Sequence, residues 1–181
     1  MGGLRAIIIR TLKGVGHMFE VGEYIVHPGQ GVCRVESVGE GDDATYKLMP
    51  VGQRHPMLIS FPAAQQDRLR RVLSADDARS LIAGYDEIQP DDYSDRSSAL
   101  EEEHFKSVIK HGTCLDSVRV AKTFRRRIAQ VRANNKRPPV AYERILKQAQ
   151  ERSLAELSIA LDCSSEDVTR LLRANDSDSD L

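Results

Sequence analysis

The 181-residue chain contains no tryptophan, and aromatic residues make up only 5% of it. No stretch approaches the roughly 18 consecutive apolar residues that a membrane-spanning helix needs, so we expect no membrane segment and no membrane partner. The three cysteines are far apart in the sequence and odd in number. They provide neither a disulfide framework nor a paired-cysteine zinc motif, and they suit the reducing cytosol. These absences exclude a membrane protein, a secreted disulfide scaffold and a small zinc module.

Catalytic and ligand-binding signatures are also absent. The five histidines form neither an HxH nor an HExxH metal motif, and there is no GxSxG nucleophile motif. Gly29 and Gly31 form a GxG, but the Lys-Ser/Thr pair of a phosphate-binding loop does not follow it. We therefore predict that the chain is not an enzyme and that it takes no metal, cofactor or small-molecule substrate.

Charge is unevenly distributed along the chain, although the net charge is only −1. Residues 104–152 carry a net charge of +10, whereas residues 74–103 carry −8 and residues 153–181 carry −5. Electrostatic potential depends on the charge within a Debye length of about 8–10 Å rather than on the total. The basic block therefore favours a polyanionic partner such as nucleic acid. The alternative is that its side chains form solvated helix faces paired with the neighbouring acidic segments.

The composition and the periodicity of the sequence change near Ser74. Residues 18–73 consist of short β-branched runs separated by glycine and proline, a pattern typical of four or five strands in a small barrel-like domain. Residues 74–174 have helical periodicity, so we predict an α+β protein of two domains, a small β-barrel followed by an all-α helical bundle. Residues 1–17 are interpreted as an N-terminal extension, from an upstream start or a cloning sequence, and residues 175–181 as a disordered acidic tail.

The helical part divides at capping residues, glycines and prolines. Residues 85–96 are predicted to form an acidic, proline-containing linker. The helices are expected at about residues 75–83, 98–110, 115–133, 139–152, 154–161 and 165–174.

Basic side chains on the expected helix 115–133 fall mostly opposite its apolar stripe, and the charge continues into the next helix. Such an arrangement suits phosphate contacts without base reading, so we expect non-specific or shape-dependent DNA binding. The predicted DNA-binding residues are Arg119, Lys122, Arg125, Arg126, Arg127, Arg132, Lys136, Arg137, Arg144 and Lys147.

Residues 153–174 suggest a different interpretation, because their apolar spacing and short polar turn fit a helix-turn-helix. In that case the chain is a free-standing DNA-binding protein that makes no polymerase contact. The second helix, however, begins with Ser165, Glu166 and Asp167, which places carboxylates where phosphates would lie, so a structural helix pair is favoured. A further alternative is an interaction module whose basic block docks on an acidic partner.

The β segment carries a family resemblance. Residues 18–32 have the sequence MFEVGEYIVHPGQGV, and a hydrophobic-proline step follows at Phe61-Pro62. This segment resembles the CarD/CdnL transcription regulators and the polymerase-interacting module of transcription-repair coupling factors. Residues 142–150 and 155–160 are similar to the closing helices of the same regulators.

The resemblance implies a function and a location. In this family a Tudor-like β domain docks on the β subunit of bacterial RNA polymerase. The helical domain contacts promoter DNA non-specifically at the upstream edge of the transcription bubble and stabilises the open complex. The expected location is the cytoplasm, in association with the nucleoid.

The resemblance also implies site residues. Ser60 occupies the place of one arginine with which family members grip polymerase, and Arg34 and Arg54 are candidate replacements. Together with Pro62 they make the predicted polymerase-binding set. Many family members insert a tryptophan at the bubble edge, and Tyr93 is the candidate wedge in this chain.

Overall fold

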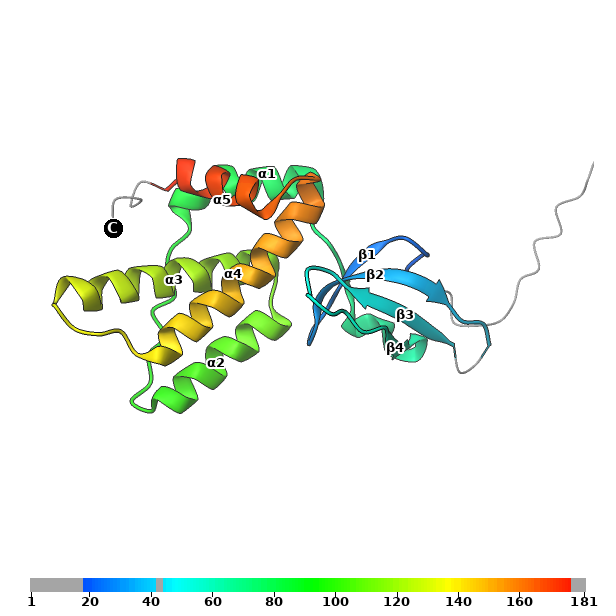
Figure 1. The fold of residues 1–181 in the computed structure, drawn as a ribbon, viewed down its shortest axis with the longest axis horizontal. Helices are drawn as coiled ribbons and strands as arrows, with labels where there is room; N and C mark the ends of the chain where they lie inside the picture. Colours follow the sequence, from blue (N-terminus) through cyan, green and yellow to red (C-terminus); the bar gives the residue numbers. More distant parts are fainter. Residues whose placement is uncertain (1–17, 42–43, 177–181) are drawn as a thin grey trace, which may run out of the picture.

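The computed structural model describes residues 18–41 and 44–176, and it has an antiparallel sheet followed by helices (Figure 1). The fold class is therefore α+β. The interpretations of residues 1–17 as an extension and of residues 177–181 as part of a tail lie outside the described residues.

The sheet has five strands in the order β4-β3-β2-β1-β5. Its strands β4 and β5 are the two edges and do not pair with each other in the described structure, so the sheet is open and the predicted barrel is not confirmed. The two-residue strand β5 is too short to show periodicity and was not predicted as a separate strand. The strands are β1 (Tyr24–His27), β2 (Gly31–Val38), β3 (Thr45–Pro50), β4 (Ile59–Pro62) and β5 (Arg70–Arg71).

One face of the sheet forms a hydrophobic core, closed by Phe19 and by the short 3-10 helix η1 (Ala63–Arg68). Buried and accessible residues alternate along β3, where Tyr46 and Leu48 are completely buried. This period-two pattern is what a strand with one buried face requires. On the other face, Val26 and Val32 are also buried, whereas Arg34 and Glu36 are exposed.

Five helices follow the sheet in the described part of the chain. Ser74, Ser97, Thr113 and Ser164 each cap a helix by accepting a hydrogen bond from a backbone N–H in its first turn, which satisfies donors that the helix leaves free. The helices are α1 (Ala75–Ala83), α2 (Ser98–His111), α3 (Cys114–Ala133), α4 (Val140–Leu161) and α5 (Ser165–Ala174).

The predicted break near residue 153 is wrong, because α4 is one continuous helix of 22 residues. Ser153 is buried, and its hydroxyl donates to the carbonyls of Ala149 and Gln150 within the same helix. The polar side chain is thus satisfied locally and does not end the helix.

The predicted linker 85–96 is an ordered strap along α3. It begins with the 3-10 helix η2 (Tyr85–Glu87), in which Tyr85 is buried. Farther on, the Asp91 N–H donates to the Thr123 hydroxyl at 2.8 Å. The strap therefore contributes to the helical core rather than only spanning a gap.

The C-terminal end of the described chain contacts α3 through a charged side chain. Asp176 is buried, and it accepts a hydrogen bond from Arg125 at 3.3 Å. Residues 175 and 176, the first two of the predicted tail, are thus hydrogen-bonded to the helical part.

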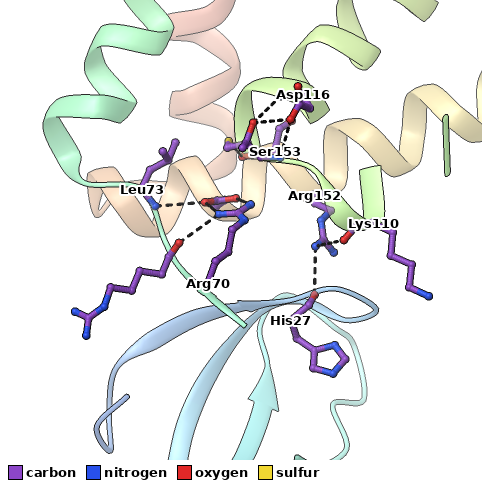
Figure 2. Close-up of polar contacts among 11 residues, drawn as sticks. His27, Arg70, Leu73, Lys110, Asp116, Arg152 and Ser153 are labelled. Carbon is purple, nitrogen blue, oxygen red and sulfur yellow. Dashed lines mark hydrogen bonds and ion pairs between the residues drawn. The ribbon is translucent and has the colours of Figure 1, made fainter. Parts of the chain in front are cut away.

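Charged side chains join the sheet to the helices (Figure 2). Arg70 of β5 donates to both carboxylate oxygens of Glu156 on α4, at 2.5 and 2.7 Å, and the Leu73 N–H donates to the same carboxylate. Arg152, one turn earlier on α4, donates to the carbonyls of His27 and Lys110, both at 3.2 Å. Sheet, α2 and α4 are thus connected through two arginines.

We expect Glu156→Gln to lower the free energy of unfolding by about 2 kcal/mol, because Arg70 loses the charge of its buried partner. Urea denaturation of the full chain measures this change. Glu151→Gln, on the same helix in an exposed pair with Lys147, should cost less than about 0.5 kcal/mol. Equal costs for the two substitutions would contradict a structural role for Glu156.

Candidate interaction surfaces

Strand β4 is an open edge of the sheet. It pairs with β3 on one side, with Lys47 opposite Ser60 and Thr45 opposite Pro62, and has no strand on its other side in the described structure. An unpaired edge presents backbone donors and acceptors to which another strand can add.

The predicted polymerase-binding residues lie near this edge, with one exception. Ser60 and Pro62 are exposed on β4 and alternate with buried Phe61. Arg54 is exposed in the loop that precedes β4. Arg34 is exposed on β2, which is separated from β4 by β3. Its guanidinium lies 3.7 Å from the Glu36 carboxylate. The structure therefore brings Ser60 and Pro62 together and leaves Arg34 apart.

Three further residues complete this surface and were not predicted as part of it. The Lys47 ammonium donates to the Ser60 hydroxyl at 2.5 Å, so it extends the polar face of the sheet. Met57 and Leu58 directly precede β4 and are 78% and 52% exposed. The period-two pattern of residues 45–50 could have placed Lys47 on the accessible face, whereas nothing local in the sequence shows that Met57 and Leu58 stay exposed.

Lys122 was predicted to contact DNA, and the structure contradicts this. Its side chain is only 2% exposed, and its ammonium donates to the carbonyls of Tyr85 and Asp86, each at 2.9 Å. The ammonium also lies 4.8 Å from the centre of the Tyr85 ring. A buried ammonium needs such acceptors, so Lys122 anchors the strap to α3 instead of reaching solvent.

Arg127 is likewise an internal residue. It pairs with buried Glu101 at 2.8 Å and donates to the carbonyls of Asp91 and Tyr93. Its guanidinium also lies within 5.5 Å of the centres of two phenylalanine rings, at distances of 5.4 and 5.1 Å. Arg127 thus ties the strap and α2 to α3, and this packing argues against a DNA contact by its side chain.

Tyr93, the candidate wedge, belongs to the same cluster. Its ring is stacked on His104 with 3.7 Å between ring centres, and its edge meets Phe105. To insert between base pairs, the ring would have to give up both contacts. This packing argues against the wedge interpretation.

Three more arginines of the basic block interact with neighbouring residues. Arg119 pairs with Asp116 on its own helix at 3.2 Å. Arg125 donates to the Tyr85 hydroxyl and pairs with buried Asp176. Arg126 is half-buried and also has an interaction partner.

The remaining predicted DNA-binding residues are exposed at and beyond the end of α3. Arg132 and Arg144 form ion pairs with Glu143 and Glu102 but are still 64% and 62% exposed. The turn between α3 and α4 lies at the end of the helical part farthest from the sheet (Figure 1). The exposed basic set consists of Arg132, Lys136, Arg137, Arg144 and Lys147.

The basic and acidic segments of the sequence therefore meet partly within the fold. Glu101 and Glu102, from the acidic segment, bind Arg127 and Arg144, and Asp176 binds Arg125. The alternative of internal pairing holds for the middle of α3, whereas the exposed basic set remains at its end.

The helix-turn-helix interpretation gains no support. Its first helix is the C-terminal half of α4, and Glu156 and Leu157 on it are buried. The first turn of α5 presents Glu166 and Asp167, and Asp167 takes part in a capping box with Ser164. These carboxylates would repel phosphates.

The described residues contain no cluster of three or more His, Cys, Asp and Glu side chains that could hold a metal ion. Burial raises the pKa of the Cys33 thiol to about 12 and also raises the pKa of Cys114, which makes both poor nucleophiles. Within the same residues no helix is both long and apolar enough to cross a membrane.

The described structure thus has an open sheet edge at one end and the exposed basic set at the other end of its helical part. Residues 19–73 match the family model described as the CarD-like/TRCF RID domain. This part of the chain is a CarD-like/TRCF RID domain, and the sequence resemblance to that family is confirmed. A comparison with curated proteins gave no match. The family is a protein-interaction domain, and the match suggests a transcription-related role that involves RNA polymerase.

We expect Arg127→Ala to lower the free energy of unfolding by about 3 kcal/mol, because it leaves buried Glu101 without its cation. Arg132→Ala, on the same helix but exposed, should cost less than about 0.5 kcal/mol. Urea denaturation compares the two variants. A small cost at Arg127 would return this residue to the candidate DNA surface.

Proposed function

We propose that the chain is a transcription regulator that binds the β subunit of bacterial RNA polymerase through β4 and contacts promoter DNA non-specifically through the exposed basic set. The observation that carries the proposal is the open edge of β4 in a domain of the polymerase-interacting family. A strand of the polymerase added to this edge would gain main-chain hydrogen bonds. By binding DNA and polymerase together, the chain modulates the stability of the open complex in the cytoplasm, at the nucleoid.

The surroundings of β4 support a protein partner. Met57 and Leu58 are apolar and exposed next to the edge, and they can supply the desolvated contacts that main-chain hydrogen bonds alone do not give. Ser60 and Lys47 add a polar rim on the accessible face. These residues, rather than the more distant Arg34, are the centre of the proposed polymerase surface.

The position of the exposed basic set supports a DNA contact. It lies at the α3–α4 turn and the first turns of α4, away from the sheet (Figure 1). Polymerase and DNA can therefore be bound at opposite ends of the chain without competing for one surface. All of its side chains are lysines or arginines, which suit contacts with phosphates rather than recognition of bases.

We expect the double variant Met57→Glu/Leu58→Glu to weaken binding to purified bacterial RNA polymerase core enzyme at least about tenfold, because two charges replace apolar contacts at the edge. Both side chains are exposed, so the fold should be unchanged. Biolayer interferometry with the full chain immobilised measures the affinity.

The matched control is Val140→Glu/Leu171→Glu, which changes two apolar residues that are 60% and 44% exposed on the helical part. This control should bind polymerase as the unchanged chain does. Unaltered binding by the Met57/Leu58 variant would place the polymerase contact elsewhere.

For the DNA contact we expect Lys136→Ala/Arg137→Ala/Lys147→Ala to weaken binding to duplex DNA of any sequence. The slope of log K against log salt should become less negative by about 2 to 3, because up to three phosphate contacts are removed. Fluorescence anisotropy over a salt series measures the slope. Arg79→Ala/Arg170→Ala, on α1 and α5, is the control and should leave the slope unchanged.

A further inference from the structure

A cavity of about 280 Å³ lies where the sheet meets the helices. Both parts contribute to its wall, so its shape depends on how they are joined. The charged and titratable side chains that line it are Asp67, Arg68 and Arg70 from the sheet part and Lys110, His111 and Arg152 from the helical part.

The basic side chains of this cavity are only partly neutralised. Arg70 is satisfied by Glu156, and Asp67 is the one carboxylate in the lining. Arg152 has no carboxylate within ion-pair distance among the described residues. Its guanidinium donates to two backbone carbonyls, and its Nε is buried without a hydrogen-bond partner. The carbonyls orient the guanidinium, and the Glu156 carboxylate that binds Arg70 offsets part of its charge through space.

The two other cations keep their charge accessible. Arg68 is exposed and donates only to the neutral amide oxygen of Gln65, at 2.8 Å. Lys110 is exposed at the end of α2; its carbonyl accepts from Arg152, and its side chain extends away from Arg152 (Figure 2). Three cations from three elements therefore border one concave site.

The pKa values of two neighbouring groups reflect these positive charges. Burial, followed by repulsion from Arg70, lowers the pKa of the Arg152 guanidinium. Burial also lowers the pKa of His27, and Arg152, Arg68 and Lys110 lower it further. The charges of all three cations thus act on the His27 imidazole, which agrees with their lying around one site.

We propose that this junction cavity binds the phosphate groups of a small anion, with Arg68, Lys110 and Arg152 as the donors. Arginine forks and lysine ammonium groups are the side chains that bind phosphate oxygens with short, charge-assisted hydrogen bonds. A volume of about 280 Å³ lies at the lower end of the range for ligand cavities, so a diphosphate or the phosphates of a nucleotide suit it.

The bound anion would connect the two parts of the chain. Arg68 belongs to η1 beside the sheet, whereas Lys110 and Arg152 belong to α2 and α4. A phosphate held by all three would link η1 to α2 and α4 and stabilise the arrangement in which these elements meet. The site is separate from β4 and from the exposed basic set, so it adds a ligand-dependent control to whatever those surfaces bind.

The experiment is an isothermal titration of the full chain with inorganic pyrophosphate at low ionic strength, together with its melting temperature. We expect one saturable site and a higher melting temperature at saturation. Sodium sulfate at equal ionic strength serves as the control for general salt effects, and it should give a smaller shift.

The variants Arg68→Gln and Lys110→Gln should each weaken pyrophosphate binding at least about tenfold, because each removes one charged hydrogen-bond donor. Both residues are exposed, so the fold is preserved. Lys136→Gln, at the far α3–α4 turn, is the matched control and should bind pyrophosphate normally. Competition with a short DNA duplex distinguishes the source of the phosphate. Displacement identifies nucleic-acid phosphates as the natural ligand, and simultaneous binding identifies a free small anion.

The absence of saturable binding would overturn the proposal. So would binding that persists unchanged in both Arg68→Gln and Lys110→Gln, or binding that is lost equally in Lys136→Gln, because the pyrophosphate would then bind to the exposed basic set.

Discussion

Glu156 lies buried on α4 and accepts hydrogen bonds from the segment that leaves the sheet, two from Arg70 and one from the Leu73 N–H. A buried carboxylate is costly unless it is paired, and this one is paired only when β5 and α4 are in contact. The arrangement of the sheet relative to the helices therefore depends on this interaction. Arg152, one turn earlier on the same helix, adds a second link to His27 and Lys110. The polymerase and DNA surfaces proposed for the chain have a defined relation in space only because these links hold.

The middle of α3 shows how one segment can be strongly basic and still largely internal. Lys122 and Arg127 are directed at backbone carbonyls of the strap and at Glu101, and they hold the strap and α2 against α3. The strap thus supplies backbone acceptors for both cations, whereas the carboxylate that pairs with Arg127 is Glu101 of α2. What remains for an external polyanion is the smaller set at the end of α3 and the start of α4. Weak, salt-sensitive association follows from so few contacts, which suits a protein held near DNA by another partner.

Periodicity and caps predicted the α+β class, the first four strands and most helix bounds, because those signals are local. Ser74, Gly112 and Ser164 mark helix ends in the sequence as they do in the structure. Most of the failures have non-local causes, and the one at Ser153 has a local cause. The burial of Lys122 and Arg127 depends on which carbonyls a distant strap supplies, and helical spacing alone placed both on the outer side. The continuity of α4 through Ser153 depends on a hydroxyl that bonds within its own helix. The junction cavity is lined by residues that are more than 80 positions apart in the sequence, so no local motif could predict it.

The continuity of α4 fixes the distance between the two ends of the molecule that the helix connects. From Val140, next to the exposed basic turn, to Glu156, which binds Arg70 at the junction with the sheet, α4 rises about 24 Å. An unbroken helix keeps this distance constant. In the proposed function, the basic turn would therefore meet the duplex at a fixed offset from the polymerase-bound sheet, and that offset is set by the length of one helix rather than by base sequence.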